Sequence, residues 1–199
     1  MSVTIFVEGG GDSQNTIRKC RAGFADYISR VTKLRCKPNV FACGGRGDAF
    51  KDFKTALENA QRDDICVLLV DSEGPIQGAD PVEHLRLRDH WEFPADLNGH
   101  RVFLMVQATE AWFLADREAL AKFYGNGFRQ KALRGSADNV EQIPKDDLVP
   151  SLNGAAKDTS KKGYHKTRDG FSLLFLIDPK KVGRASPHAE QFHQFLREL

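Results

Sequence analysis

Apolar runs alternate with amphipathic segments along the first two thirds of the chain. Residues 3–7 (VTIFV) and 65–70 (ICVLLV) are β-branched or apolar throughout, a pattern typical of strands covered on both faces of a parallel sheet. The predicted strands cover residues 3–7, a segment ending at 40–42, residues 65–70 and residues 101–106. Apolar positions at helical spacing predict helices over residues 12–29, 49–62, 81–89, 110–115 and a segment through 123. This alternation predicts an α/β fold with a mainly parallel sheet flanked by helices.

The amino-acid composition of the sequence changes after residue 124. Gly, Asn, Lys and Ser become frequent, and the pattern predicts helices at residues 145–152, 170–177 and 187–199. We expect these helices to pack their apolar faces on the sheet. The 199 residues would then form a single domain, with an α/β core over residues 1–124 and a mostly helical C-terminal extension over residues 125–199.

Composition and charge limit the functional classes. The chain has 29 Lys and Arg against 27 Asp and Glu, and this net charge of +2 does not by itself indicate a nucleic-acid binder. No apolar run approaches the ~20 residues of a membrane span, and no signal peptide is recognisable, so we expect a cytoplasmic protein with no membrane contact. The four cysteines form no CxxC pair and the six histidines have no metal-ligand spacing, which disfavours a zinc enzyme.

Acidic residues follow three of the predicted strands. They are Glu8 and Asp12 after the first, Asp71 and Glu73 after the third, and Glu110 after the fourth. The carboxyl ends of parallel strands converge, and clustered carboxylates repel one another unless a divalent cation neutralises them. An oxygen-only ligand set suits Mg²⁺ or Mn²⁺. The alternative is that these are polar residues of strand-terminating turns and that Asp12 only caps a helix.

Basic residues that could bind a phosphate occur in two places. Arg46 lies on a Gly-rich turn after the second strand and could clamp a phosphate in the same crevice, or could be a surface arginine. The segment 157–169 has an excess of positive charge that includes Lys161, Lys162 and Lys166, with Tyr164 available to stack on a base. It could equally be a solvated loop. A further basic stretch at residues 16–37 could lie along nucleic acid.

Several sequence blocks resemble a known fold family. The order of elements, with Val7-Glu8-Gly9 after one strand and Val70-Asp71-Ser72-Glu73 at another, resembles the TOPRIM core of topoisomerases, primases and overcoming-lysogenization-defect (OLD) family nucleases. Five blocks in order look like a bacterial TOPRIM-like family of unknown function, namely residues 7–12, 42–46, 69–73, 109–116 and 177–179. The resemblance spans nearly the whole chain and implies a TOPRIM-like Rossmannoid sheet.

The resemblance also implies roles for individual residues. Glu8 would be a metal ligand or acid/base group, and Asp71 and Glu73 would bind Mg²⁺. Glu73 departs from the usual DxD pattern by one methylene, which leaves its metal contact open. Glu110 resembles the extra acidic residue with which nuclease members hold a second metal. Lys166 resembles the catalytic lysine of OLD-like nucleases by its place before a predicted helix.

Together with this resemblance, the acidic residues predict an Mg²⁺-dependent nuclease that hydrolyses phosphodiesters. The resemblance further implies an effector of a bacterial defence or toxin system with a separate ATPase partner. Two alternatives stay open: a non-catalytic TOPRIM-like subunit that binds an ATPase or nucleic acid, and a metal-dependent phosphohydrolase for a small phosphate substrate. A groove wide enough for a duplex beside the metal site would favour the nuclease. A flat apolar patch around an occluded site would favour the subunit.

Overall fold

The described part of the chain contains one four-stranded parallel sheet. The computed structural model describes residues 2–11, 13–31, 38–94, 97 and 101–199. The strands are β1 (Ser2–Val7), β2 (Asn39–Ala42), β3 (Asp64–Asp71) and β4 (Val102–Met105), in the order β2-β1-β3-β4. The prediction of an α/β fold with a parallel sheet flanked by helices is confirmed, and the architecture is Rossmann-like.

The strand register aligns the carboxyl ends of the strands. Val7, the last residue of β1, pairs with Ala42 of β2 and with Leu69 of β3. Asp71, the last residue of β3, pairs with Met105 at the end of β4. The segments that leave the four strands therefore start from one edge of the sheet.

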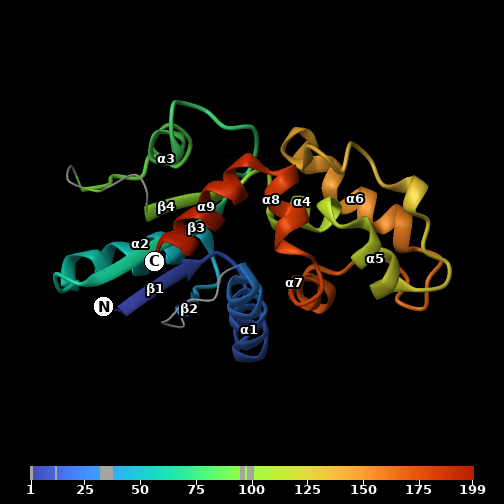
Figure 1. The fold of residues 1–199 in the computed structure, drawn as a ribbon, viewed down its shortest axis with the longest axis horizontal. Coiled ribbons are helices and arrows are strands. Elements are labelled where there is room, and N and C mark those ends of the chain that lie inside the picture. Colours follow the sequence, from blue (N-terminus) through green and yellow to red (C-terminus); the bar gives the residue numbers. More distant parts are fainter. Residues whose placement is uncertain (1, 12, 32–37, 95–96, 98–100) are drawn as a thin grey trace.

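Two hydrophobic clusters lie on the two faces of the sheet. Alternate residues of β1 contribute to different clusters: Ile5 and Val7 belong to the larger cluster, and Phe6 belongs to the smaller one. The smaller cluster is closed by α2 (Arg46–Asn59) and α3 (Pro81–Asp89), and the larger by α1 (Gln14–Val31) and α9 (Pro187–Glu198). Figure 1 shows the C-terminal helix α9 lying across the sheet.

The helices after β4 extend the larger cluster beyond the carboxyl edge of the sheet. They are α4 (Thr109–Ala115), α5 (Arg117–Tyr124), α6 (Lys145–Ala156), α7 (Phe171–Leu174) and α8 (Pro179–Ala185). Figure 1 shows α5 and α6 beside the sheet, at the end where the strands finish. Two 3-10 turns, Gln130–Ala132 and Val140–Gln142, lie between α5 and α6.

The structure differs from the predicted helix at residues 170–177. A π-helical turn, η4 (Lys166–Gly170), runs directly into the four-residue α7. The sequence prediction also lacked α8. This helix begins at Pro179 with the Asp178 carboxylate accepting a hydrogen bond from Lys180 N, and the Asp-Pro pair was the available signal.

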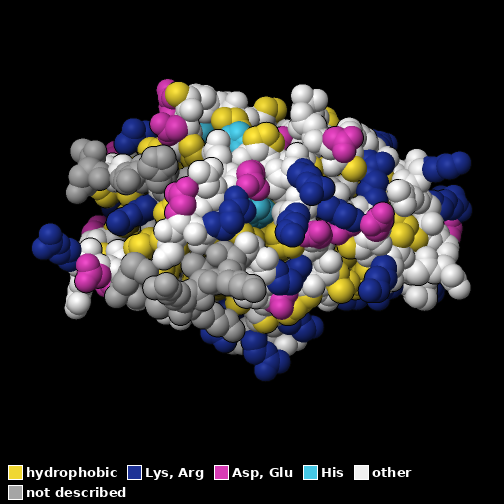
Figure 2. Space-filling model, viewed as in Figure 1, with side chains coloured by type: hydrophobic (Ala, Val, Ile, Leu, Met, Phe, Trp, Pro, Cys, Tyr) yellow, Lys and Arg dark blue, Asp and Glu magenta, His cyan; other side chains and the backbone are white. Residues whose placement is uncertain are grey.

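The surface carries mixed charge. Figure 2 shows many Lys and Arg side chains, with Asp and Glu among them, over the part of the molecule where Figure 1 places α8 and α9. Among the described residues, no helix combines the length and apolar character that crossing a membrane requires.

Candidate metal centre

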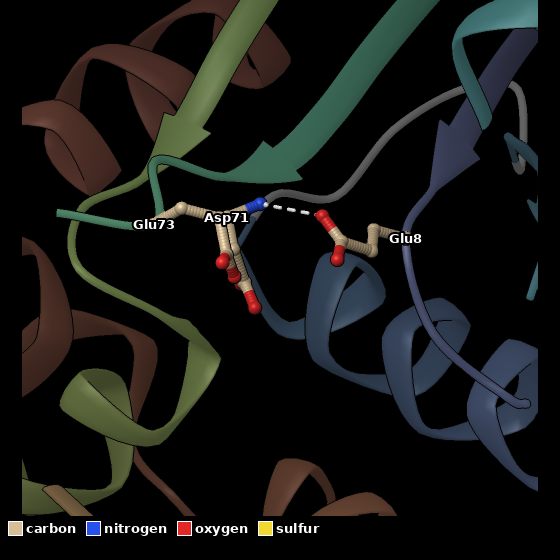
Figure 3. A group of neighbouring side chains, drawn as sticks. All are labelled: Glu8, Asp71 and Glu73. Carbon is tan, nitrogen blue, oxygen red and sulfur yellow. Dashed lines mark hydrogen bonds between the residues drawn. The ribbon is translucent and has the colours of Figure 1, made fainter. Parts of the chain in front are cut away.

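Three carboxylates meet at the carboxyl edge of the sheet. Glu8 directly follows β1, Asp71 ends β3, and Glu73 lies two residues further on. Each offers a carboxylate oxygen, and these three oxygens all lie within 4.8 Å of one another. Figure 3 shows the three side chains turned toward a common space. The structure thus brings together three of the five predicted metal ligands.

The backbone and α4 fix the orientation of these carboxylates. Asp71 N donates a hydrogen bond of 3.2 Å to Glu8 Oε2, which Figure 3 draws as a dashed line. Asp71 Oδ1 accepts two more, from Thr109 N at 2.8 Å and Thr109 Oγ1 at 2.9 Å. Thr109 is the first residue of α4, so the helix start holds the buried Asp71 side chain in place.

The electrostatics of the cluster disfavour three bare negative charges. Burial raises the pKa of Asp71 to about 7, and the neighbouring charges of Glu8 and Glu110 act in the same direction. Burial also raises the pKa of Glu8, with a further contribution from Glu73, against the opposing charge of Arg46. A cation placed between the carboxylates would favour their ionised forms.

Glu73 reaches the cluster from an unusual backbone conformation. Its φ of 65° lies in the left-handed region, which is uncommon for a residue with a side chain. Its Oε2 forms ion pairs with Lys145 at the start of α6 and, at 3.5 Å, with Arg88 Nη2 in α3. Two basic side chains from different helices therefore hold the Glu73 carboxylate in place. The aspartate of the usual DxD pattern would be one methylene shorter at this position.

Arg46 lies behind the carboxylates and is fully engaged by the protein. Its Nη1 donates to Glu8 Oε2 at 3.2 Å and to the Asp71 carbonyl oxygen. Its Nε and Nη2 donate to the two oxygens of Asp89 at 3.0 and 2.7 Å, and the guanidinium lies 5.0 Å from the Trp91 ring centroid. The structure therefore places Arg46 as a positioning residue for Glu8, and its role as a phosphate clamp stays a prediction.

A cavity of about 260 Å³ opens beside the cluster. Glu8, Asp71, Glu110 and Lys166 contribute to its polar lining, and the rest is mainly apolar. Glu110, in α4, is 3% exposed and accepts a hydrogen bond of 2.9 Å at Oε1 from the Tyr164 hydroxyl. Glu110 thus lies on the same cavity as the cluster but outside the group of three converging oxygens.

Lys166 brings a positive charge to this cavity. Burial lowers its pKa, but the neighbouring carboxylates raise it by more, so the pKa lies above its usual value. These carboxylates belong to Glu110, Asp71, Glu8 and Glu73. Lys166 is therefore charged at neutral pH.

The other predicted site residues lie elsewhere. Lys161 has its ammonium 4.4 Å from the Phe123 ring centroid, and Lys162 is exposed. Neither lysine lines the cavity, and their role in substrate binding stays a prediction. Tyr164 is buried on Glu110 and is not displayed on a solvated loop. Asp12 lies outside the described residues.

Sequence reasoning missed two kinds of residue at this centre. Thr109, the first residue of α4, holds Asp71 through its N–H and its hydroxyl. No local sequence signal marks this contact, because the N-cap of α4 is Ala108 and Thr109 does not cap the helix. Asp89 and Trp91, which hold Arg46, carried no signal because their roles depend on the tertiary placement of α3 beside α2.

Comparisons with known proteins gave one match. Residues 7–197 match the family model described as "Domain of unknown function (DUF4276)". Searches of curated proteins and of solved structures found no significant match. The matched range includes Glu8, Asp71, Glu73, Glu110 and Lys166, so the whole centre lies within the family's shared region.

Proposed function

The chain belongs to the family DUF4276, and we propose that it is an Mg²⁺-dependent hydrolase of phosphodiester bonds in nucleic acid. The observation that carries the proposal is the convergence of Glu8, Asp71 and Glu73 at the ends of two neighbouring parallel strands, beside a charged lysine in a cavity. The resemblance of Val7-Glu8-Gly9 and Val70–Glu73 to the TOPRIM motifs supports it, because these segments supply the three carboxylates.

The donor set fits a hard divalent cation. All three side chains offer carboxylate oxygens, which Mg²⁺ and Mn²⁺ prefer over nitrogen or sulfur. The raised pKa of Asp71 and of Glu8 marks a cluster whose charges lack sufficient compensation from the protein. Glu8, Asp71 and Glu73 would hold the cation, and Glu110 is the candidate ligand for a second one.

Hydrolysis joins a water oxygen to phosphorus and breaks the bond to the leaving sugar oxygen, which takes up a proton. The bound cation would supply Lewis-acid polarisation and a more acidic water. Lys166 would pair its ammonium with the negative charge that develops on the phosphate. Thr109 and Arg46 keep Asp71 and Glu8 oriented, so these carboxylates need no rearrangement during the reaction.

A small-molecule phosphohydrolase is the second candidate. The cavity beside the carboxylates measures about 260 Å³, which suits a compact group better than a duplex. On the family resemblance alone, we also propose that the protein acts in the cytoplasm as an effector of a bacterial defence or toxin system, with a separate ATPase as its partner.

Calorimetric titration with Mn²⁺ tests the metal centre before any substrate is chosen. We expect wild type to bind the cation and Asp71→Asn to lose binding by at least about 10-fold, since 1.4 kcal/mol already corresponds to that factor. Asp63→Asn is the matched control, because Asp63 is exposed and precedes β3 at the opposite edge of the sheet. Equal affinities in all three proteins would overturn the metal assignment.

Hydrolysis assays then separate the candidate functions. Wild type with Mg²⁺ is offered single-stranded DNA, single-stranded RNA, duplexes and small phosphate esters. Cleavage of an oligonucleotide supports the nuclease, whereas release of phosphate from small esters alone supports the phosphohydrolase. Metal binding without turnover of any of these substrates would favour the non-catalytic subunit.

A further inference from the structure

We propose that the cavity beside the carboxylates binds a single unpaired nucleobase, so that the substrate is a nucleotide whose base lies outside a duplex. The inference rests on the proposed function for the position of the phosphate. The base-binding step itself needs neither metal nor hydrolysis, so the two ideas can fail separately.

Aromatic side chains from separate elements form the wall of this cavity. Phe113 comes from α4, Phe171 from α7 and Phe24 from α1, and Tyr164 precedes η4. The Phe113 and Tyr164 rings have centroids 6.3 Å apart and are inclined by 55°. Each of these side chains is at most 8% exposed, so the wall is held by the core behind it. Buried aromatic walls of this kind accept planar rings.

Glycines keep the cavity open. A Cβ on Gly170 would lie 2.9 Å from the Tyr164 hydroxyl and 3.7 Å from the Phe113 ring. A Cβ on Gly9 would lie 3.0 Å from Cys20 Sγ and 3.8 Å from the Phe171 ring. Side chains at these two positions would therefore crowd the residues of the aromatic wall.

The size of the cavity selects for one ring system. A dry protein cavity of ~150 Å³ is enough for a benzene-sized ring. A cavity of about 260 Å³ therefore accommodates a one-ring or two-ring heterocycle but leaves no room for a base pair. A duplex would have to present a flipped, terminal or unpaired nucleotide.

The polar groups of the lining favour a base over an alkyl chain. Glu110 has Oε1 bonded to Tyr164, and its Oε2 makes no hydrogen bond within the described part of the chain. With one cation held by Glu8, Asp71 and Glu73 and no second cation at Glu110, this oxygen can accept a hydrogen bond from a base amino group. Lys166 also lines the cavity, and its positive charge interacts both with Glu110 and with the carboxylate cluster. Glu8 and Asp71 also line the cavity, so a base inside it has its phosphate within reach of the proposed cation.

Binding of nucleosides tests the base site without hydrolysis. Deoxyadenosine and deoxycytidine are titrated against wild type by ligand-observed NMR, once in EDTA and once in Mg²⁺, with ribose as the control ligand. We expect the two conditions to give nucleoside affinities within about 3-fold of each other, and ribose to bind at least about 10-fold more weakly, since stacking supplies most of the affinity. Absence of nucleoside binding to wild type, or equal binding of ribose, overturns the proposal.

A space-filling variant locates the binding. Thr167 lines the cavity and is partly exposed, so Thr167→Trp places an indole at the cavity without replacing a buried side chain. We expect at least about 10-fold weaker nucleoside binding. Leu176→Trp adds the same group at a side chain that is 43% exposed and outside the lining, and should bind as wild type does. Far-UV circular dichroism checks that both variants are folded.

Hydrolysis by wild type gives a test that needs no variant. An oligonucleotide with one abasic position is compared with the intact single strand and with the same sequence in a duplex. We expect cleavage next to the abasic position and within the duplex to fall by at least about 10-fold. Equal cleavage of all three substrates overturns the base site and leaves the hydrolase standing. Nucleoside binding without any hydrolysis keeps the base site and overturns the hydrolase.

Discussion

Lys166 is the residue whose replacement best separates catalysis from metal binding. In Lys166→Gln, the ammonium beside the carboxylates disappears, while Glu8, Asp71 and Glu73 remain. Loss of one group that stabilises developing charge costs roughly 10²–10³ in kcat. We expect such a fall with Mn²⁺ affinity unchanged or higher, because a competing positive charge has been removed.

The control for Lys166 is Lys161→Gln. Lys161 lies over the Phe123 ring and does not line the cavity, so its loss should leave kcat within about 2-fold of wild type by the argument that distant charges are screened. If Lys161→Gln lowered kcat as much as Lys166→Gln does, the substrate would lie along residues 157–169 and away from the cavity. Steady-state rates of oligonucleotide cleavage decide between these outcomes.

Arg46 offers a residue-scale prediction about stability. In Arg46→Gln, the partly buried carboxylates of Glu8 and Asp89 lose the guanidinium that lies between them. Removing one partner of such a network destabilises a fold by about 3–5 kcal/mol. Arg129→Gln is the control, because Arg129 and Asp158 are about half exposed and such surface pairs contribute less than about 1 kcal/mol. Urea unfolding of both variants measures the difference.

The sequence located the acidic residues but not the groups that position them. Glu8 and Asp71 follow apolar strands, so the rule that parallel strands end at one edge was enough to expect them together. Two of the partners of Arg46, Asp89 and Trp91, lie at the end of α3 and just after it, and their contact with Arg46 depends on how α3 packs. The aromatic wall of the cavity could not be predicted from the sequence for a related reason. Phe24, Phe113 and Phe171 each fit an apolar helix face, and sequence alone cannot separate a cavity wall from a filled core.

At the scale of elements, the turn from β1 into α1 depends on a glycine. Gly10 has φ of 100°, and a Cβ there would lie 2.9 Å from Ile17 Cα and 3.4 Å from Ile17 N. Gly10→Ala should therefore destabilise the protein by about 1–3 kcal/mol, through backbone strain and contact with the backbone of α1. Gly154→Ala, in α6 with open space around it, should instead stabilise by about 0.5 kcal/mol. Equal effects in thermal unfolding would contradict this account of the turn.

The packing of α9 on α1 predicts a pH dependence. Burial lowers the pKa of His193 to about 4, with Glu190 opposing the shift, and Tyr27 Oη lies 3.0 Å from its Nε2. Between the unfolded pKa of ~6.5 and about 4, the unfolded chain takes up a proton that the folded chain does not. Stability should therefore fall as pH falls through this window, by up to ~3 kcal/mol from this residue.

Comparison with His193→Gln separates the contribution of His193 to the pH dependence of stability from that of the carboxylates, which also titrate in acid. The free energy of unfolding of wild type relative to the variant should decrease between pH 7.5 and pH 4.5. Parallel curves for the two proteins would mean that His193 titrates equally in the folded and unfolded states. Urea unfolding at a series of pH values provides the measurement.

Long elements were predictable and short irregular ones were not. The apolar runs of β1 and β3 and the periodicity of α1 and α9 depend on local sequence alone, and the structure has these elements within a few residues of the predicted ranges. The π-helical turn η4 departs from helical spacing by one residue per turn, so the periodic pattern merged it with α7. This irregular turn is also the segment that places Lys166 and Thr167 on the cavity.

At the scale of the whole molecule, the larger hydrophobic cluster joins residues from both ends of the chain. It includes Val3 of β1 and Leu196 of α9, and Phe103 of β4 has its ring 5.2 Å from that of Phe192. The cavity likewise combines Glu8 and Asp71 with residues that follow position 163. The prediction of a single domain over residues 1–199 then means that the α/β core and the helical extension unfold together.

The two tryptophans allow a direct test, because they lie in different clusters. Trp112 belongs to the larger cluster, and Trp91 packs on the smaller one. Trp91→Phe and Trp112→Phe each leave one fluorescent reporter. Within each variant, the urea midpoint from fluorescence should coincide with that from far-UV circular dichroism. Trp112→Phe should also be less stable, because a fully buried side chain is shortened.

Separate midpoints within one variant would show that the sheet and the helical extension unfold as different units. In that case the cavity would lose its aromatic wall before the carboxylates lose their strands, because Phe113, Tyr164 and Phe171 lie after the sheet while Glu8 and Asp71 lie at its edge. Metal binding would then survive at urea concentrations that abolish nucleoside binding. Coincident midpoints predict that both activities disappear together, since one cooperative structure holds the two halves of the centre.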